Sequence, residues 1–189
     1  MIFVETKLPG AYLIKPERHE DERGYNAETF CQKEFVEHGL NPNVVQCSVS
    51  FNQLKGTFRG MHFQAPPYQQ EKLVTCLQGA ALDYIVDLRP NSPTFKEYIK
   101  VELSQENGFA LYIPKSFAHG FLTLHDNTLL MYQMSEYHHD ETDHGFRWDD
   151  PAFDISLPFK VTNQAENEKN YPDLYVLPVL SDYEIELKR

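Results

Sequence analysis

An apolar, strand-like segment, Thr57-Phe-Arg-Gly-Met-His-Phe-Gln64, carries two chemically active side chains, Arg59 and His62. Lys72 follows ten residues after His62. A histidine beside two cations is suited to removing a proton from carbon and to stabilising the resulting enolate. Strict strand alternation places Arg59 and His62 on opposite faces, so both point inward only if Gly60 hosts a β-bulge. The loop after this segment predicts a hairpin that returns Lys72 to His62.

Short strands separated by turns extend on both sides of this segment. We predict strands over residues 1–5, 11–15, 25–30, 44–51, 57–63, 71–77, 80–88, 97–103, 109–113, 120–124 and 128–136. A short helix is predicted over 32–38, where Gly39 ends it. Many short strands at this spacing indicate an antiparallel sandwich or jelly roll. The sequence therefore predicts an all-β barrel with short peripheral helices.

The chain length favours a single domain. A chain of 189 residues is long enough to bury one substantial core. Within a domain spanning 1–189, we expect N-terminal strands over 1–55, a barrel core over 56–136, and C-terminal loops with short helices over 137–189.

Composition excludes several classes of partner. The net charge of −11 argues against nucleic acid or an anionic membrane surface. No apolar run reaches the roughly 18 residues of a membrane span, and the first residues lack the features of a secretory signal. The three cysteines are widely spaced and form no Cys-x-x-Cys pair, which favours a reducing compartment. We therefore expect a cytoplasmic protein that binds neither nucleic acid nor membrane.

Two further side chains lie in strand-like contexts, His119 and Tyr132. The pattern Pro-x4-His-Gly that ends at Gly120 resembles the second motif of cupin barrels. Metal-binding cupins carry His-x-His in their first motif, but the second position here is Gln64. Two scattered histidines make a poor ligand set, so we expect no metal. The tract 138–144 is rich in His, Asp and Glu but lacks periodicity, and it predicts a solvated loop.

Several motifs together resemble those of the dTDP-4-dehydrorhamnose 3,5-epimerase family, over about residues 2–175. The motifs are Arg59-Gly-Met-His-Phe-Gln64, Glu71-Lys-Leu-Val74, Val86-Asp-Leu-Arg89 with Ser92-Pro-Thr-Phe95, Ile113-Pro to His119-Gly-Phe121, and Gly145-Phe-Arg-Trp-Asp-Asp-Pro-Ala152. The resemblance implies a cupin-like jelly roll that uses no metal or other cofactor. It also implies a homodimer in which N-terminal strands reach into the partner subunit. The implied reaction is epimerisation at C3 and/or C5 of a nucleoside-diphosphate 4-keto-6-deoxyhexose, in deoxysugar biosynthesis.

The same resemblance assigns roles to individual residues. His62 matches the general base, Tyr132 matches the general acid, and Glu168 stands where the family has the aspartate that partners the base. The implied substrate-binding residues are Arg23, Glu28, Gln46, Arg59, Lys72, His119, His138 and Asp143. These residue types suit the chemistry, because a C4 ketone acidifies the protons on C3 and C5.

Some positions depart from the family pattern. Asn26 and His138 replace aromatic residues, Ser48 replaces an asparagine, and Asn167 replaces a lysine beside Glu168. The departures leave the nucleotide base, the sugar and the number of inverted carbons open. The alternatives are an epimerase of a GDP- or CDP-linked sugar, a sugar-nucleotide ketoisomerase, and a non-catalytic protein that binds sugar nucleotides.

Overall fold

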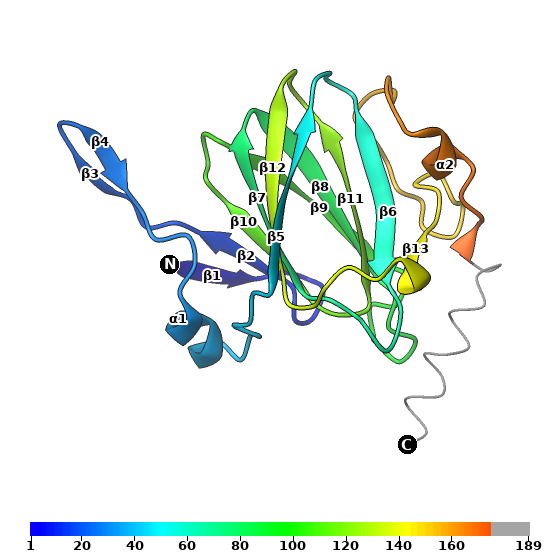
Figure 1. Ribbon diagram of the computed structural model, residues 1–189, viewed down its shortest axis with the longest axis horizontal. Coiled ribbons are helices and arrows are strands. Elements are labelled where there is room, and N and C mark those ends of the chain that lie inside the picture. The colour runs from blue at the N-terminus through cyan, green and yellow to red at the C-terminus, as the bar shows by residue number, and fades with distance from the viewer. Residues whose placement is uncertain (175–189) are drawn as a thin grey trace.

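Two antiparallel sheets form the body of the molecule in the computed structural model, which describes residues 1–174 (Figure 1). The larger sheet has the order β1-β2-β10-β7-β12-β5, and the smaller one has the order β13-β6-β11-β8-β9. In the larger sheet the bounds are β1 Ile2–Glu5, β2 Tyr12–Lys15, β5 Gln46–Asn52, β7 Lys72–Gln78, β10 Ala110–Ile113 and β12 Thr128–Met134. In the smaller sheet they are β6 Phe58–Gln64, β8 Ala80–Asp87, β9 Tyr98–Ser104, β11 Phe117–Thr123 and β13 Asp143–Gly145.

The five-stranded sheet is covered on both faces, and strand β8 shows why. Ala81 and Ile85 belong to the core cluster between the two sheets, with side chains from β7, β10 and β12. Tyr84 and Val86 point the other way, into a second cluster that includes Phe146, Phe153, Ile155 and Leu174 from the C-terminal segment. That segment also carries the 3-10 helix η1 (Asp140–Thr142) and helix α2 (Glu166–Lys169). The C-terminal segment is therefore packed on the outer face of the sheet.

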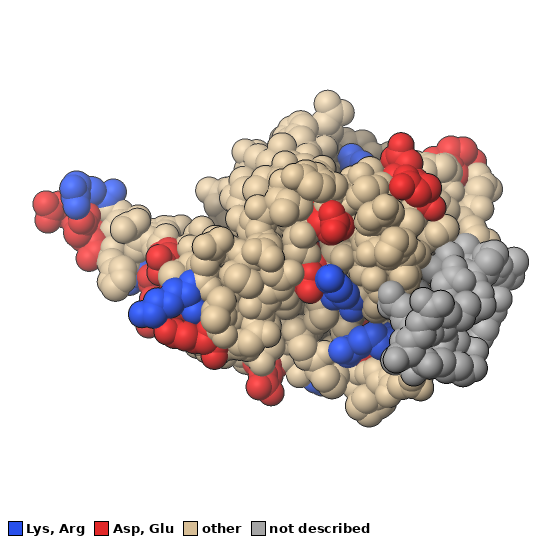
Figure 2. Space-filling view, turned by 60° about the horizontal axis from the view of Figure 1, so that its bottom comes forward, with Lys and Arg blue, Asp and Glu red and all other residues tan. Residues whose placement is uncertain are grey.

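The N-terminal region contains a hairpin that extends away from the sandwich (Figure 1). Strands β3 (His19–Asp21) and β4 (Gly24–Asn26) pair only with each other, and every residue in them is exposed. Charged side chains gather on this projection (Figure 2). Arg23 pairs with Asp21 at the turn of the hairpin. The following helix α1 (Gln32–Glu37) is anchored by Phe35, whose ring packs against Phe3 and Tyr112. The helix thus attaches the base of the hairpin to the larger sheet.

Most predicted strands agree with the structure, and the prediction of an all-β fold is confirmed. Two boundaries were wrong, and two short strands were missed. The strand predicted to run to residue 30 ends at Asn26, because the exposed hairpin stops there. Strand β11 begins at Phe117 and so contains His119, which the prediction placed outside it. Strands β3 and β13 were missed, because three-residue strands carry too little alternation to detect.

The predicted hairpin between β6 and β7 is also wrong, because the two strands belong to different sheets. The loop between them crosses from one sheet to the other. His62 and Lys72 therefore approach each other across the interior of the sandwich. The part of the predicted C-terminal region over 175–189 lies outside the described residues. Within residues 1–174, no helix is long and apolar enough to span a membrane.

Candidate active site

A cavity of about 440 Å³ opens between the two sheets. Its lining residues are Ser48, Val49, Ser50, Phe51, Arg59, His62, Lys72, His119, Phe121, Tyr132 and Met134. Five of these were singled out from the sequence, namely Arg59, His62, Lys72, His119 and Tyr132. They come from β6 and β11 of one sheet and from β7 and β12 of the other. The sandwich thus brings two histidines, two cations and a phenol to one interior space.

Arg59 and His62 reach the same cavity because β6 is irregular at Gly60. The pairing register between β6 and β11 shifts near this residue, as the expected β-bulge requires. Gly60 has φ of +119°, and a Cβ there would lie 2.6 Å from the Cα of Gly120. Only glycine fits such a position without strain. The register shift agrees with the β-bulge at Gly60 that the sequence required if Arg59 and His62 were to share one face.

His62 is paired with a carboxylate from the C-terminal segment. Its Nε2 lies 3.0 Å from Oε1 of Glu168, which sits in α2 and is 4% exposed. The backbone N–H of Gly60 donates to the same oxygen at 3.3 Å. Because the carboxylate accepts a hydrogen bond, Nε2 carries the proton of the neutral ring. Nδ1 then keeps its lone pair and can accept a proton. The ring of Tyr171 packs edge-on against His62, with the centroids 5.9 Å apart.

Gly145 provides the space for that packing. It is the residue of β13 that pairs with His62, and a Cβ on it would lie 2.3 Å from the Tyr171 ring. His62 is therefore held on one side by Glu168 and on another by an aromatic ring that a side chain at position 145 would displace.

A second histidine–carboxylate pair lies one strand away. His119 is the register partner of His62 across β11 and β6, and its Nε2 lies 2.9 Å from Oδ1 of Asp83. His119 is 5% exposed and Asp83 is fully buried. The His119 ring also packs edge-on against Tyr132, 5.9 Å between centroids. Sequence analysis missed Asp83 as a site residue, although an acid facing inward from an otherwise apolar strand was a usable signal.

The phenol of Tyr132 is held in its protonated form. Burial raises the pKa of Tyr132 above its ordinary value, and the charge of Asp83 adds to this shift. The charge of Arg59 and a hydrogen bond with Ser50 act in the opposite direction. A neutral phenol with a cation nearby can give up a proton and have the resulting phenolate stabilised.

Lys72 contributes a cation to the same space. Burial lowers the pKa of Lys72, while the charges of Asp143 and Asp83 favour its ammonium form. Asp143 lies on β13 opposite Gln64, at the edge of the five-stranded sheet. Asp143 does not line the cavity, but its negative charge favours the ammonium form of Lys72, which does.

Four other predicted site residues lie elsewhere. Arg23 is on the projecting hairpin and Glu28 follows it, so neither lines the cavity of its own chain. Gln46 begins β5 and accepts a hydrogen bond from the backbone N–H of His138 at 3.0 Å. The His138 ring is paired with Asp140 at the surface.

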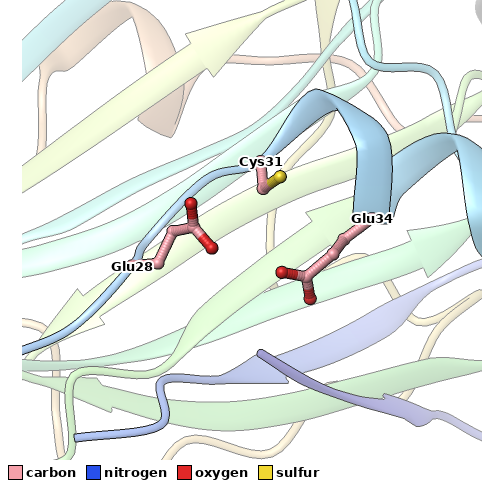
Figure 3. Close-up of side chains that lie close together, drawn as sticks. All are labelled: Glu28, Cys31 and Glu34. Carbon is pink, nitrogen blue, oxygen red and sulfur yellow. The ribbon is translucent and has the colours of Figure 1, made fainter. Parts of the chain in front are cut away.

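Among residues 1–174, one group of three potential metal ligands comes together, Glu28, Cys31 and Glu34 (Figure 3). Their ligand atoms lie within 4.8 Å of one another beside the start of α1. The carboxylate of Glu34 is already paired with the N-terminal ammonium at 2.9 Å. Two carboxylates with one thiol match none of the usual ligand sets of structural zinc. The tract 138–144, which the sequence indicated to be a solvated loop, does not form such a group.

The fold and the cavity define an isomerase with a cupin-like barrel, and comparisons with known proteins identify its family. The chain belongs to the dTDP-4-dehydrorhamnose 3,5-epimerase family, whose model matches residues 5–175. It is 41% identical over 185 residues to the dTDP-4-dehydrorhamnose 3,5-epimerase of Sinorhizobium fredii, covering 97% of this chain and 94% of the relative.

Solved structures agree with this assignment. The crystal structure of dTDP-4-dehydrorhamnose 3,5-epimerase from Elizabethkingia anophelis superposes with a TM-score of 0.89 at 36% identity, over 93% of this chain and 97% of that one. The Legionella pneumophila dTDP-6-deoxy-D-glucose-3,5-epimerase, in complex with dTDP-4-keto-L-rhamnose, gives a TM-score of 0.89 at 32% identity over 96% of each chain.

Proposed function

We propose that this chain inverts C3 and/or C5 of a dTDP-linked 4-keto-6-deoxyhexose, by removing a proton next to the C4 ketone and returning one to the opposite face. Two comparisons support this substrate. The Sinorhizobium fredii relative is named for the 3,5-epimerisation of dTDP-4-dehydrorhamnose, and the Legionella pneumophila protein binds dTDP-4-keto-L-rhamnose. Deoxysugar biosynthesis is the corresponding setting.

The proposed reaction begins at His62. Its Nδ1 accepts the proton from C3 or C5, while Nε2–H keeps its hydrogen bond to Glu168, whose carboxylate stabilises the imidazolium. The electron pair of the broken C–H bond moves onto the C4 oxygen. Lys72 stabilises this enolate oxygen as a cation, and Arg59 lines the same cavity with a guanidinium that binds anionic groups of the substrate.

Tyr132 completes the inversion. In the proposal its phenol gives a proton to the carbon from the face opposite His62, and the C4 ketone re-forms. Arg59 and Ser50 then stabilise the phenolate, in agreement with the direction in which each moves the pKa of Tyr132. The reaction is redox-neutral, and these side chains provide both proton transfers, so it needs no redox cofactor.

The single observation that carries the proposal is the shared cavity. His62 reaches it from the five-stranded sheet and Tyr132 from the six-stranded sheet, so a sugar between the sheets has one of these groups on each side. Proton transfer requires such groups to lie close to hydrogen-bonding reach of the substrate.

The projecting hairpin supports the proposal of a homodimer. Arg23 and Glu28, proposed to contact the nucleotide, do not line the cavity of their own chain. In a two-fold symmetric dimer the same hairpin can reach the partner's cavity, and the reverse contact follows by symmetry. We also propose a cytoplasmic location, which agrees with three free cysteines at Cys31, Cys47 and Cys76.

Incorporation of solvent deuterium tests the function. The wild-type chain in D₂O is expected to place deuterium at C3, C5 or both in dTDP-4-keto-6-deoxyglucose, and NMR of the product reports which carbons are inverted. GDP- and CDP-linked 4-ketosugars should exchange more slowly. A ketone moved from C4 to C3 would instead identify a ketoisomerase. No exchange above a His62→Ala control with any of these sugars would overturn the proposal, and binding without exchange would indicate a non-catalytic protein.

A further inference from the structure

Asn52, the last residue of β5, is a buried amide that bonds to both sheets. It is 2% exposed. Its Oδ1 accepts a hydrogen bond of 2.8 Å from Nε of Arg59 on β6 of the smaller sheet. Its Nδ2 donates to the backbone oxygens of Ser50 at 3.1 Å and Thr128 at 3.3 Å in the larger sheet. Because donors and acceptor are all used, the amide is fixed in one orientation.

The bond from Asn52 fixes the direction of the Arg59 guanidinium. This side chain is long and would otherwise sample many rotamers, and Arg59 is an exposed residue of β6 that lines the cavity. A bond at Nε orients the plane of the group and leaves Nη1 and Nη2 available. In the part of the chain that the structure describes, these two nitrogens make no hydrogen bond or ion pair. A guanidinium presented in this way matches the two oxygens of a phosphate or carboxylate.

We infer that Asn52 is a positioning residue that aims the guanidinium of Arg59 at an anionic oxygen of the bound sugar nucleotide. The inference rests on the proposed function, because that function supplies the anionic ligand. Asn52 does not line the cavity, so it acts through Arg59. With Asn52 in place, less side-chain entropy is lost when Arg59 binds the ligand.

A double-mutant cycle tests whether Asn52 acts through Arg59. The affinity for dTDP is measured by calorimetry for wild type, Asn52→Ala, Arg59→Ala and the double variant. We expect Asn52→Ala to weaken binding about ten-fold and Arg59→Ala to weaken it further, as suits a hydrogen bond to a charged group. The double variant should bind within about two-fold of Arg59→Ala, because non-additivity marks residues that act together.

Matched variants separate positioning from general damage. Asn107 likewise has an amide whose donor and acceptor are both used, with three hydrogen bonds in the turn between β9 and β10. Asn107→Ala should lower the melting temperature and leave dTDP affinity unchanged. Asn52→Asp is the second variant in case Asn52→Ala does not fold. Its carboxylate pairs with Arg59 and neutralises the cation, so affinity should again fall.

The outcomes distinguish this inference from the proposed function. Unchanged dTDP affinity in folded Asn52 variants, or fully additive effects in the cycle, would overturn the role of Asn52 while deuterium exchange by the wild type still stood. Non-additive effects of the Asn52 and Arg59 variants, without any deuterium exchange by the wild type, would support the role of Asn52 and contradict the proposed epimerase function. A wild-type chain that binds no nucleoside diphosphate would overturn the inference as well.

Discussion

The two histidine–carboxylate pairs whose histidines line the cavity are neighbours in the fold but differ in construction. His119 and Asp83 lie on adjacent strands β11 and β8, and their side chains are 6% and 0% exposed. His62 lies on β6 and is 33% exposed, while its partner Glu168 comes from helix α2, outside the sheet. Both pairs have similar N–O distances, 2.9 Å and 3.0 Å. Both histidines line the cavity, so the pairs differ in the exposure of the histidine and in the element that supplies the carboxylate.

This difference indicates that the two pairs have different roles. A group that exchanges protons with substrate must be open to it, and the His62–Glu168 pair meets that condition. The His119–Asp83 pair is almost completely buried, although the His119 ring borders the cavity, and an unpaired partner there would cost free energy. We therefore expect changes to the first pair to affect turnover and changes to the second to affect stability.

The largest effect is expected for His62→Asn. Loss of the proposed base should lower the rate of deuterium exchange by about 10³-fold or more, because it removes the imidazole that accepts the proton from carbon. Exchange is followed by NMR and stability by thermal unfolding. A variant that kept a tenth of the wild-type exchange rate would contradict the role of His62 as the base.

Asp83→Ala should have the largest effect on stability. It leaves the His119 ring buried without its acceptor, which costs about 3 kcal/mol. For a chain of this size that corresponds to a melting temperature lower by roughly 6–12 °C. Differential scanning calorimetry measures the change. An unchanged melting temperature would show that the buried pair is dispensable to the fold.

Changes at Glu168 sharpen the comparison, because charge and length can be varied separately. Glu168→Gln removes the charge that stabilises the imidazolium and should slow exchange about 100-fold, or about 2.7 kcal/mol. Glu168→Asp keeps the charge but shortens the side chain, and should slow exchange about ten-fold.

Glu166→Gln is the matched control on the same helix. Glu166 is exposed and pairs with Lys169, not with a histidine. Its loss should leave the exchange rate within about two-fold of wild type. Equal effects of the Glu166 and Glu168 variants would mean that the helix, and not the carboxylate, matters.

The smallest effect concerns a third buried carboxylate, Asp87, four residues along β8 from Asp83. Burial alone would raise the pKa of Asp87, but hydrogen bonds from Arg89, Ser92 and Thr94 outweigh it and hold the pKa below 3.8. Stability from this network is therefore present above pH 3.8 and is lost as the pH falls through the folded-state pKa.

Asp87→Asn should remove that acid-sensitive contribution of roughly 1 kcal/mol. Urea unfolding of both proteins from pH 6 to pH 2.5 measures it. The difference in unfolding free energy between wild type and variant should narrow at the lowest pH. A constant difference over the whole range would contradict the predicted titration.

Local patterns predicted the strands well but not the arrangement of the sheets. Alternation in β8 placed Asp83 and Asp87 opposite Tyr84, as observed. The loop before Lys72 suggested a hairpin, yet β7 joins the other sheet, because loop length does not determine which sheet the next strand enters.

The candidate site was likewise predicted only in part, because local patterns do not show which strands become neighbours. His62, Lys72 and Tyr132 are found around one cavity, as family resemblance suggested, and Glu168 does reach His62. Asp83 and Asn52 were missed, since their importance depends on contacts with residues 36 and 7 positions away along the chain. Spacing within a motif carries no record of such cross-strand contacts.

The C-terminal cover of the five-stranded sheet has a consequence for inactivation. Phe153 and Leu174 bind the cover to the outer face, and Glu168 lies between them in the chain. If this C-terminal segment detaches in a local opening while the two sheets stay paired, His62 loses the carboxylate of Glu168. During heating or limited proteolysis, the rate of turnover should therefore fall before circular dichroism detects any loss of β-structure.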